Sequence, residues 1–277
     1  MNYNFVKMNP SGNTTILITS PVPETEYRDI SIKVMKETSL CAEQVGFVVP
    51  SISNNAIARL QMMGGEFCGN GSRCLAAWIA LGGLKDGHPS KFLNKKNIPI
   101  EVSGNDGILT AEVTNINKAN ACHVAIEMPK PVDINHYRNA TLGEHSLVVY
   151  NGIIHIILWD VPADSGYIDI VHNYLSFKNL DDSCFGIMFF NTHAFSMVPL
   201  VYVKDINSLV WENSCGSGTV AVASAIAHRE KRDVENLEIS QPGGKLFADI
   251  QWEGEKIKNA SLKGDITITA TGTVYVD

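Results

Sequence analysis

The chain has 277 residues, of which 45% are hydrophobic, and its 22 Lys and Arg residues are outnumbered by 29 Asp and Glu residues, for a formal net charge of −7. This length predicts one large domain or two small ones, with enough apolar residues to form a core. The negative charge and the lack of a run of basic residues argue against nucleic acid and an anionic membrane as partners, because both need a local positive potential.

Neither a leader nor a membrane span is apparent in the sequence. Residues 1–7 lack the charged and then apolar order of a signal peptide, and no stretch of about 18 apolar residues occurs. We therefore expect a cytoplasmic protein that binds no membrane.

The predicted elements are mostly short strands separated by Gly, Pro and Asn. Strands are expected where β-branched residues run between turn residues, and helices where apolar residues recur at helical spacing. In chain order, the predicted strands are 14–19, 46–49, 98–102, 108–113, 146–150, 153–159, 200–203 and 266–270, and the predicted helices are 27–38, 75–81 and 220–228. This pattern predicts an α/β or α+β fold.

Two prolines, Pro129 and Pro131, close a strand pattern near the middle of the chain, and a polar stretch follows them. This is the best candidate for a domain boundary. It divides the chain nearly in half, which prompts a search for internal repetition.

Each half carries one copy of the same motif. Residues 68–72 read CGNGS and residues 215–219 read CGSGT, so both follow the pattern C-G-x-G-[ST]. Ala76, Ile79 and Ala80 after the first copy match Ala223, Ile226 and Ala227 after the second in register. Each copy is therefore predicted to be a glycine-rich turn that leads into an apolar helix.

A cysteine at the start of a helix lies in a defined electrostatic setting. The first N–H groups of a helix have no partner within it, and the helix dipole adds partial positive charge, so a thiolate is favoured. The same N–H groups bind a carboxylate, and glycines let the ligand approach closely. Cys68 and Cys215 are therefore the candidates for chemistry. The other cysteines are expected to be packing thiols: Cys41, Cys74, Cys122 and Cys184.

Two acid/base groups on opposite sides of one carbon are what stereoinversion needs. If the halves pack face to face, one thiolate removes the Cα proton of a small-molecule amino-acid substrate while the other thiol donates to the opposite face. The negative charge that develops must be stabilised by donors fixed in advance, a task that suits the N–H groups of the two turns. The sequence contains no ligand cluster for a metal.

Four segments together resemble the cofactor-independent amino-acid racemases, the group that includes diaminopimelate epimerase and proline racemase. They are residues 5–13 (FVKMNPSGN), 68–74 (CGNGSRC), 211–219 (WENSCGSGT) and 241–246 (QPGGKL). The resemblance implies two similar domains, each a β-rich barrel-like unit around a central helix, with the active site in the cleft between them and no cofactor. It also implies that the last strand returns to the first domain, so the expected domains are 1–130 with 266–277, and 131–265.

The resemblance also assigns site residues. Cys68 and Cys215 match the two catalytic bases, and Asn13 matches a substrate-contacting residue. His155 matches a histidine of the family, or is a strand histidine held by a neighbour. The residues that match those holding the substrate carboxylate are Gly69, Asn70, Gly216, Ser217, Gly218 and Thr219.

Departures from the family pattern bear on the substrate. No Arg lies near Glu212, and Ile153 replaces an Asn of the family, so diaminopimelate is disfavoured. Glu212, unless it is a solvated surface residue, is expected to orient the thiol of Cys215 or to accept the substrate ammonium. Glu43, unless it is a solvated residue at a strand end, offers a second carboxylate for a basic or imidazole side chain. Residues 43–47, 66–70 and 211–219 look most like the histidine racemases of this family.

Other interpretations stay open at this point. The substrate can be another amino acid, the protein can be a hydrolase in which His155 activates Cys68 or Cys215 as a nucleophile, or it can be a binder that kept the scaffold. A homodimer is possible, but the sequence does not decide the oligomeric state.

Overall fold

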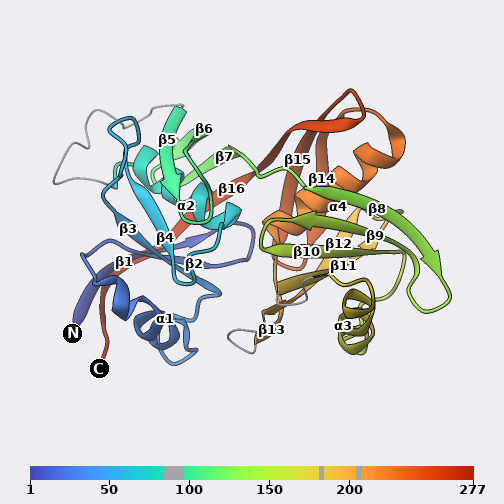
Figure 1. Cartoon of the computed structure of the whole chain (residues 1–277). Helices are drawn as coiled ribbons and strands as arrows, with labels where there is room; N and C mark the ends of the chain where they lie inside the picture. The colour runs from blue at the N-terminus through green and yellow to red at the C-terminus, as the bar shows by residue number, and fades with distance from the viewer. Residues whose placement is uncertain (84–96, 181–183, 204–207) are drawn as a thin grey trace. The chain divides into compact units, whose positions relative to one another are not determined.

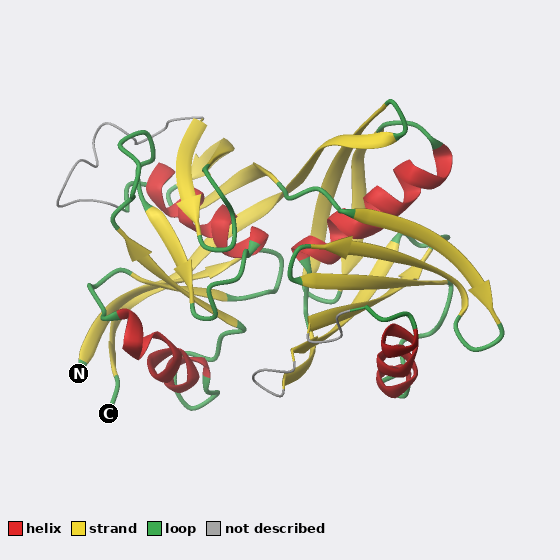
Figure 2. Ribbon diagram, in the orientation of Figure 1, coloured by secondary structure: helices red, strands yellow, loops and turns green. Residues whose placement is uncertain are grey.

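The computed structural model describes residues 1–83, 97–180, 184–203 and 208–277, which form two compact units. The first unit comprises Met1–Glu127 and Lys263–Asp277, and the second comprises Met128–Leu262. Strands predominate in both units, and helices are few (Figure 2). No helix among the described residues is long and apolar enough to cross a membrane.

The first unit is a closed sheet around a helix (Figure 1). Its strands pair in the order β1-β2-β3-β4-β5-β6-β7-β16, and β1 also pairs with β16, which closes the circle. All twelve residues of α2 are buried, as expected for a helix enclosed by strands. The elements are β1 (Asn2–Asn9), β2 (Thr15–Ile18), η1 (Glu24–Glu26), α1 (Tyr27–Met35), β3 (Gln44–Val49), β4 (Arg59–Met62), α2 (Gly69–Ala80), β5 (Asn97–Val102), β6 (Ile108–Lys118), β7 (Ala121–Glu127) and the end of β16 (Lys256–Tyr275).

The second unit likewise arranges its strands around a central helix, α4. Its strands pair in the order β16-β15-β14-β12-β11-β10-β9-β8, with β13 added to β12. The elements are β8 (Asp133–Asn139), β9 (Gly143–Tyr150), β10 (Ile153–Trp159), α3 (Tyr167–Phe177), β11 (Cys184–Asn191), β12 (Ser196–Val203), β13 (Ser208–Trp211), α4 (Gly216–Glu230), β14 (Val234–Gln241), β15 (Gly244–Glu253) and the start of β16.

The two units repeat one order of connections. In the first, β2 and β3 are parallel with α1 between them in sequence, and β4 and β5 are parallel around α2. In the second, β10 and β11 are parallel with α3 between them, and β12 and β14 are parallel around α4. A parallel pair needs a crossover connection, and the helices supply it. The second helix of each unit is the one that carries a C-G-x-G turn.

The sheet-rich α+β prediction is confirmed, and the predicted strands and helices all overlap observed elements. Two helices begin earlier than predicted, at Gly69 and Gly216, because the glycine-rich turns are themselves the first helical turns. The sequence did not predict α3. This helix buries only Val171 and Leu175 among its residues, and its β-branched and aromatic content is typical of strands.

Of the four cysteines predicted to be packing thiols, only some are buried. Cys74 and Cys122 are buried, and burial raises the pKa of each thiol to about 12. Cys184 is only half-buried. Cys41 is exposed, directly after a turn and with φ 49°, so its prediction as a packing thiol was wrong.

Candidate active site

Each cysteine of the repeated motif is the N-cap residue of a buried helix. Cys68 precedes α2 with φ −129° and ψ 109°, and Cys215 precedes α4 with φ −115° and ψ 112°. The sulfur of Cys68 accepts a hydrogen bond from the Gly71 N–H at 3.2 Å, and that of Cys215 accepts one from the Gly218 N–H at 3.4 Å. Both sulfurs therefore lie at the positive end of a helix dipole, where negative charge is stabilised.

The third residue after each cysteine has little room for a side chain. A Cβ placed on Gly71 would lie 3.4 Å from the Cys68 sulfur, and one placed on Gly218 would lie 3.3 Å from the Cys215 sulfur and 2.2 Å from the Met188 sulfur. Glycine at this position lets the backbone N–H approach the thiol.

A glutamine from β14 holds the second turn in place. Gln241 Oε1 accepts a hydrogen bond from the Cys215 N–H at 2.8 Å, and Gln241 Nε2 donates to Thr219 Oγ1 at 2.9 Å. The Thr219 hydroxyl in turn donates to the Cys215 carbonyl at 2.7 Å. Sequence analysis used Gln241 only as part of a supporting segment, so its role in the turn was missed.

The first unit gathers polar side chains beside Cys68. The Cys68 thiol lies 2.8 Å from Gln44 Oε1, and Gln44 directly follows Glu43. The half-buried Glu43 carboxylate accepts a hydrogen bond from Asn13 Nδ2 at 2.9 Å. The buried Asn13 Oδ1 has no hydrogen-bond partner among the described residues. The predicted residues Asn13, Glu43 and Cys68 therefore lie together, with Gln44 as a link that sequence analysis missed.

A buried arginine contacts the first glycine-rich turn, the one that begins at Cys68. Arg73 is fully buried, and its Nη2 donates to Asn70 Oδ1 at 2.7 Å. Its Nε and Nη1 have no hydrogen-bond partner among the described residues. Burial lowers the Arg73 pKa to about 10, so the guanidinium stays charged at neutral pH. The matching position after Cys215 is Val220, so the two turns differ in charge.

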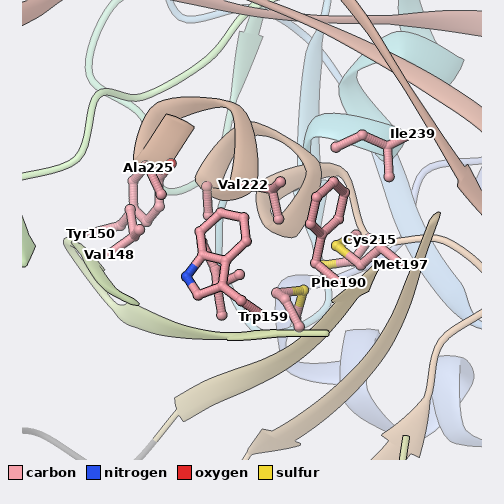
Figure 3. Close-up of a cluster of buried hydrophobic side chains, with 12 residues drawn as sticks. Val148, Tyr150, Trp159, Phe190, Met197, Cys215, Val222, Ala225 and Ile239 are labelled. Carbon is pink, nitrogen blue, oxygen red and sulfur yellow. The ribbon is translucent and has the colours of Figure 1, made fainter. Parts of the chain in front are cut away.

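Cys215 lies in an apolar environment. It belongs to a buried cluster that also contains Phe190 and Met197 (Figure 3). Burial raises the pKa of the Cys215 thiol well above its ordinary value, and the nearby Glu212 carboxylate raises it further, while the Ser217 hydroxyl and the Gly218 N–H lower it. The uncharged thiol is therefore the favoured form, which suits a proton donor.

His155 is buried in the second unit beside the same turn. Its Nε2 lies 2.9 Å from Ser217 Oγ, and Ser217 Oγ lies 3.5 Å from the Cys215 sulfur. Burial lowers the His155 pKa to about 3, so the imidazole is neutral. Nδ1 has no hydrogen-bond partner among the described residues, and Ser217 separates Nε2 from the thiol. These contacts do not favour a hydrolase in which His155 directly deprotonates Cys215.

The predicted site residues fall into two groups, one in each unit. Cys68, Gly69, Asn70, Asn13 and Glu43 belong to the first unit. The second unit holds Cys215, Gly216, Ser217, Gly218, Thr219, Glu212 and His155.

Comparison with known proteins identifies the family. The family model described as the histidine racemase CntK N-terminal domain matches residues 2–275. A histidine racemase of Fusobacterium nucleatum is 36% identical, over 99% of this chain and 96% of that protein. One of Staphylococcus aureus is 28% identical, over 99% of this chain and 97% of that protein. The diaminopimelate epimerase of Xanthomonas campestris is 26% identical over only 68% of this chain and 65% of that protein.

Solved structures agree on the fold. A PhzF-family phenazine biosynthesis protein from Bacillus anthracis aligns with a TM-score of 0.67 at 15% identity, over 100% of both chains. A hydroxyproline epimerase from Agrobacterium vitis aligns with a TM-score of 0.65 at 10% identity, over 100% of this chain and 93% of that one. The resemblance derived from the sequence motifs is thus confirmed, and the chain belongs to the histidine racemase family of amino-acid racemases.

Proposed function

We propose that the protein interconverts L- and D-histidine by a two-base mechanism in which Cys68 and Cys215 act on opposite faces of the same Cα. The observation that carries this proposal is the repeated thiol N-cap, with one cysteine at the positive end of each buried helix. One thiolate removes the Cα proton, the opposite thiol donates one, and the roles exchange for the other enantiomer.

The main energetic difficulty is the weak acidity of the Cα–H next to a carboxylate. Helix-terminal N–H groups that bind the carboxylate stabilise the charge that develops in the transition state, because they are already oriented. Gly69, Asn70, Gly216 and Ser217 are placed in the first turns of α2 and α4, where such groups are available. The proposal requires both turns to bind one substrate.

Recognition of the imidazole is assigned to Glu43. Its carboxylate is half-buried, is hydrogen-bonded to Asn13 and adjoins Gln44, which contacts the Cys68 thiol. A carboxylate in this position accepts a hydrogen bond from an imidazole N–H, more strongly when the ring is protonated. The names of the full-length relatives support histidine as the substrate. Glu212, whose charge acts on Cys215, is assigned to orienting that thiol or binding the substrate ammonium.

The experiment is Cα deuterium incorporation in D2O with each common L-amino acid, followed with optical rotation. We expect histidine to exchange and racemise. Cys68→Ser and Cys215→Ser should each abolish racemisation, and Cys41→Ser, a change at an exposed cysteine, should leave it intact. Racemisation that persists in either active-site variant would refute the two-thiol mechanism. Exchange of a different amino acid in place of histidine would refute histidine as the substrate. An acyl adduct on a single cysteine would indicate a hydrolase.

A further inference from the structure

The hydroxyl of Ser217 links a buried imidazole to a catalytic thiol. His155 Nε2 lies 2.9 Å from Ser217 Oγ, and Ser217 Oγ lies 3.5 Å from the Cys215 sulfur. All three residues belong to the second unit, with His155 on β10 and Ser217 in the first turn of α4. Either the serine or the cysteine can be the donor in the second contact, so the direction depends on which ring nitrogen carries the proton.

Two observations place that proton on Nε2. The imidazole is neutral and carries a single N–H, and Nδ1 is buried with no hydrogen-bond partner among the described residues. Buried N–H groups without a partner are rarer than buried acceptors without one. In addition, a Cβ built on Gly186 would lie 2.6 Å from Nδ1, so a Cα hydrogen of Gly186 points at this nitrogen. A C–H group facing Nδ1 suits a lone pair and disfavours an N–H there.

The direction of the remaining hydrogen bond follows. Because Nε2–H donates to Ser217 Oγ, the serine hydrogen is free to point at the Cys215 sulfur. We propose that His155 is a positioning residue, which holds the Ser217 hydroxyl as a donor to the Cys215 thiolate, a role that rests on the proposed function of Cys215 as a base. His155 itself then neither takes up the substrate proton nor contacts the substrate.

The surroundings of Cys215 make such a donor consequential. Burial among apolar residues and the Glu212 carboxylate both disfavour a thiolate, and the Ser217 hydroxyl and the Gly218 N–H oppose them. Tyr150 is a further titratable group in this environment; its ring packs edge-on against His155 with the ring centroids 6.0 Å apart, and burial raises its pKa. Without His155 the serine hydroxyl can rotate away, and the thiolate loses one of its donors.

The test measures the thiolate of Cys215 without using catalysis. The full-length protein is alkylated with iodoacetamide over a range of pH, and the rates at the Cys215 and Cys68 peptides are followed by mass spectrometry. In His155→Phe and in Ser217→Ala we expect alkylation of Cys215 at about pH 8 to fall about tenfold, because a hydrogen bond to a charged group contributes about 1.5 kcal/mol. The rate at Cys68 should stay unchanged. The double variant should lose no more than either single variant.

Two further variants sharpen the result. His155→Gln, whose amide N–H reaches about where Nε2–H lies, should recover most of the rate. His145→Phe is the matched control, since His145 is likewise buried and its Nε2 contacts the hydroxyl of Tyr174 at 3.0 Å. This control should leave Cys215 unchanged.

Additive losses in the double variant, or an unchanged rate in His155→Phe, would overturn the positioning role. If circular dichroism shows that His155→Phe is unfolded, the two remaining variants test the positioning role. Ser217→Ala must then slow alkylation of Cys215, and His155→Gln must leave its rate close to that of the wild type. Alkylation needs no substrate, so the two proposals can fail separately. If the variants show the expected alkylation rates but the wild-type protein racemises no amino acid, the positioning of Ser217 by His155 stands and the proposed function is refuted.

Discussion

Arg73 Nη2 donates to Asn70 Oδ1 at 2.7 Å within the first turns of α2. A guanidinium has donors only, so this contact fixes the orientation of the Asn70 amide, with the oxygen toward Arg73 and the NH2 group turned away from it. Under the proposed function, the NH2 group is thereby positioned as a donor for the substrate carboxylate.

Replacing Arg73 with Met should therefore separate stability from activity. Arg73 is fully buried with two nitrogens lacking a hydrogen-bond partner among the described residues, so removing its charge should leave the urea midpoint unchanged or higher. The KM for histidine should rise about tenfold, because the Asn70 amide is no longer held. Steady-state kinetics and urea denaturation check both expectations.

The control for Arg73 is a double-mutant cycle. In an Asn70→Ala background, the Arg73→Met change should add little to KM if it acts through Asn70. A lower urea midpoint together with an unchanged KM would assign Arg73 to the core alone.

Glu43 should govern the choice of substrate. Glu43→Gln keeps an oxygen that can accept from Asn13 Nδ2, so the fold of the loop should be preserved. The loss of charge should raise the KM for histidine about tenfold and leave any slow exchange of alanine unchanged. Glu66→Gln, at an exposed acid beside the first motif, is the matched control. Equal losses for histidine and alanine would contradict a role for Glu43 in recognising imidazole.

Local signals account for what the sequence predicted well. Cys68 and Cys215 follow a short motif whose glycines and position before an apolar helix determine the turn within a few residues. The sheet-rich α+β class likewise followed from short β-branched runs. Helix α3 was missed because its β-branched and aromatic content is typical of strands, and only two of its residues are buried.

The partners of the motif residues required the fold. Gln241 on β14 contacts Cys215, from which it is separated by 26 positions in the sequence. Gln44 on β3 contacts Cys68, from which it is separated by 24 positions. His155 was left between two interpretations because its neighbours depend on the register of β10 against β11. No local pattern in the sequence specifies such contacts.

Mild oxidation should inactivate the protein reversibly. If Cys68 and Cys215 act on one carbon, their sulfurs come close enough during catalysis for an oxidant to join them. We expect loss of racemisation, a Cys68–Cys215 cross-linked peptide by mass spectrometry, and recovery with dithiothreitol. Cys41→Ser should behave like the wild type. Full activity in protein that demonstrably contains this disulfide would contradict the proposed site.

His155 should make the second unit sensitive to acid. Its pKa falls from 6.5 in the unfolded chain to about 3 in the fold because of burial, so the unfolded state binds a proton that the folded state excludes. Stability is therefore complete above pH 6.5 and declines as the pH falls toward the folded pKa, with a slope of up to about 1.4 kcal/mol per pH unit. Urea midpoints followed by circular dichroism down to about pH 4 should fall less steeply for His155→Phe than for the wild type. Parallel curves would show that His155 is solvated or charged in the fold.

Gly186 tests the same imidazole from its other side. It pairs with His155 in the parallel register of β10 and β11, and a Cβ there would lie 2.6 Å from His155 Nδ1 and 2.6 Å from the flexible end of Met188. Gly186→Ala should therefore displace the ring from Ser217 without removing any polar side chain from the protein. We expect a lower kcat and slower alkylation of Cys215, with alkylation of Cys68 unchanged.

Gly152→Ala is unsuitable as a control, because Gly152 has φ 87°. Ser224→Ala is the better control, because it changes a buried residue on α4 without adding volume near the ring. Wild-type kinetics in Gly186→Ala would show that the position of the His155 ring does not matter to Cys215.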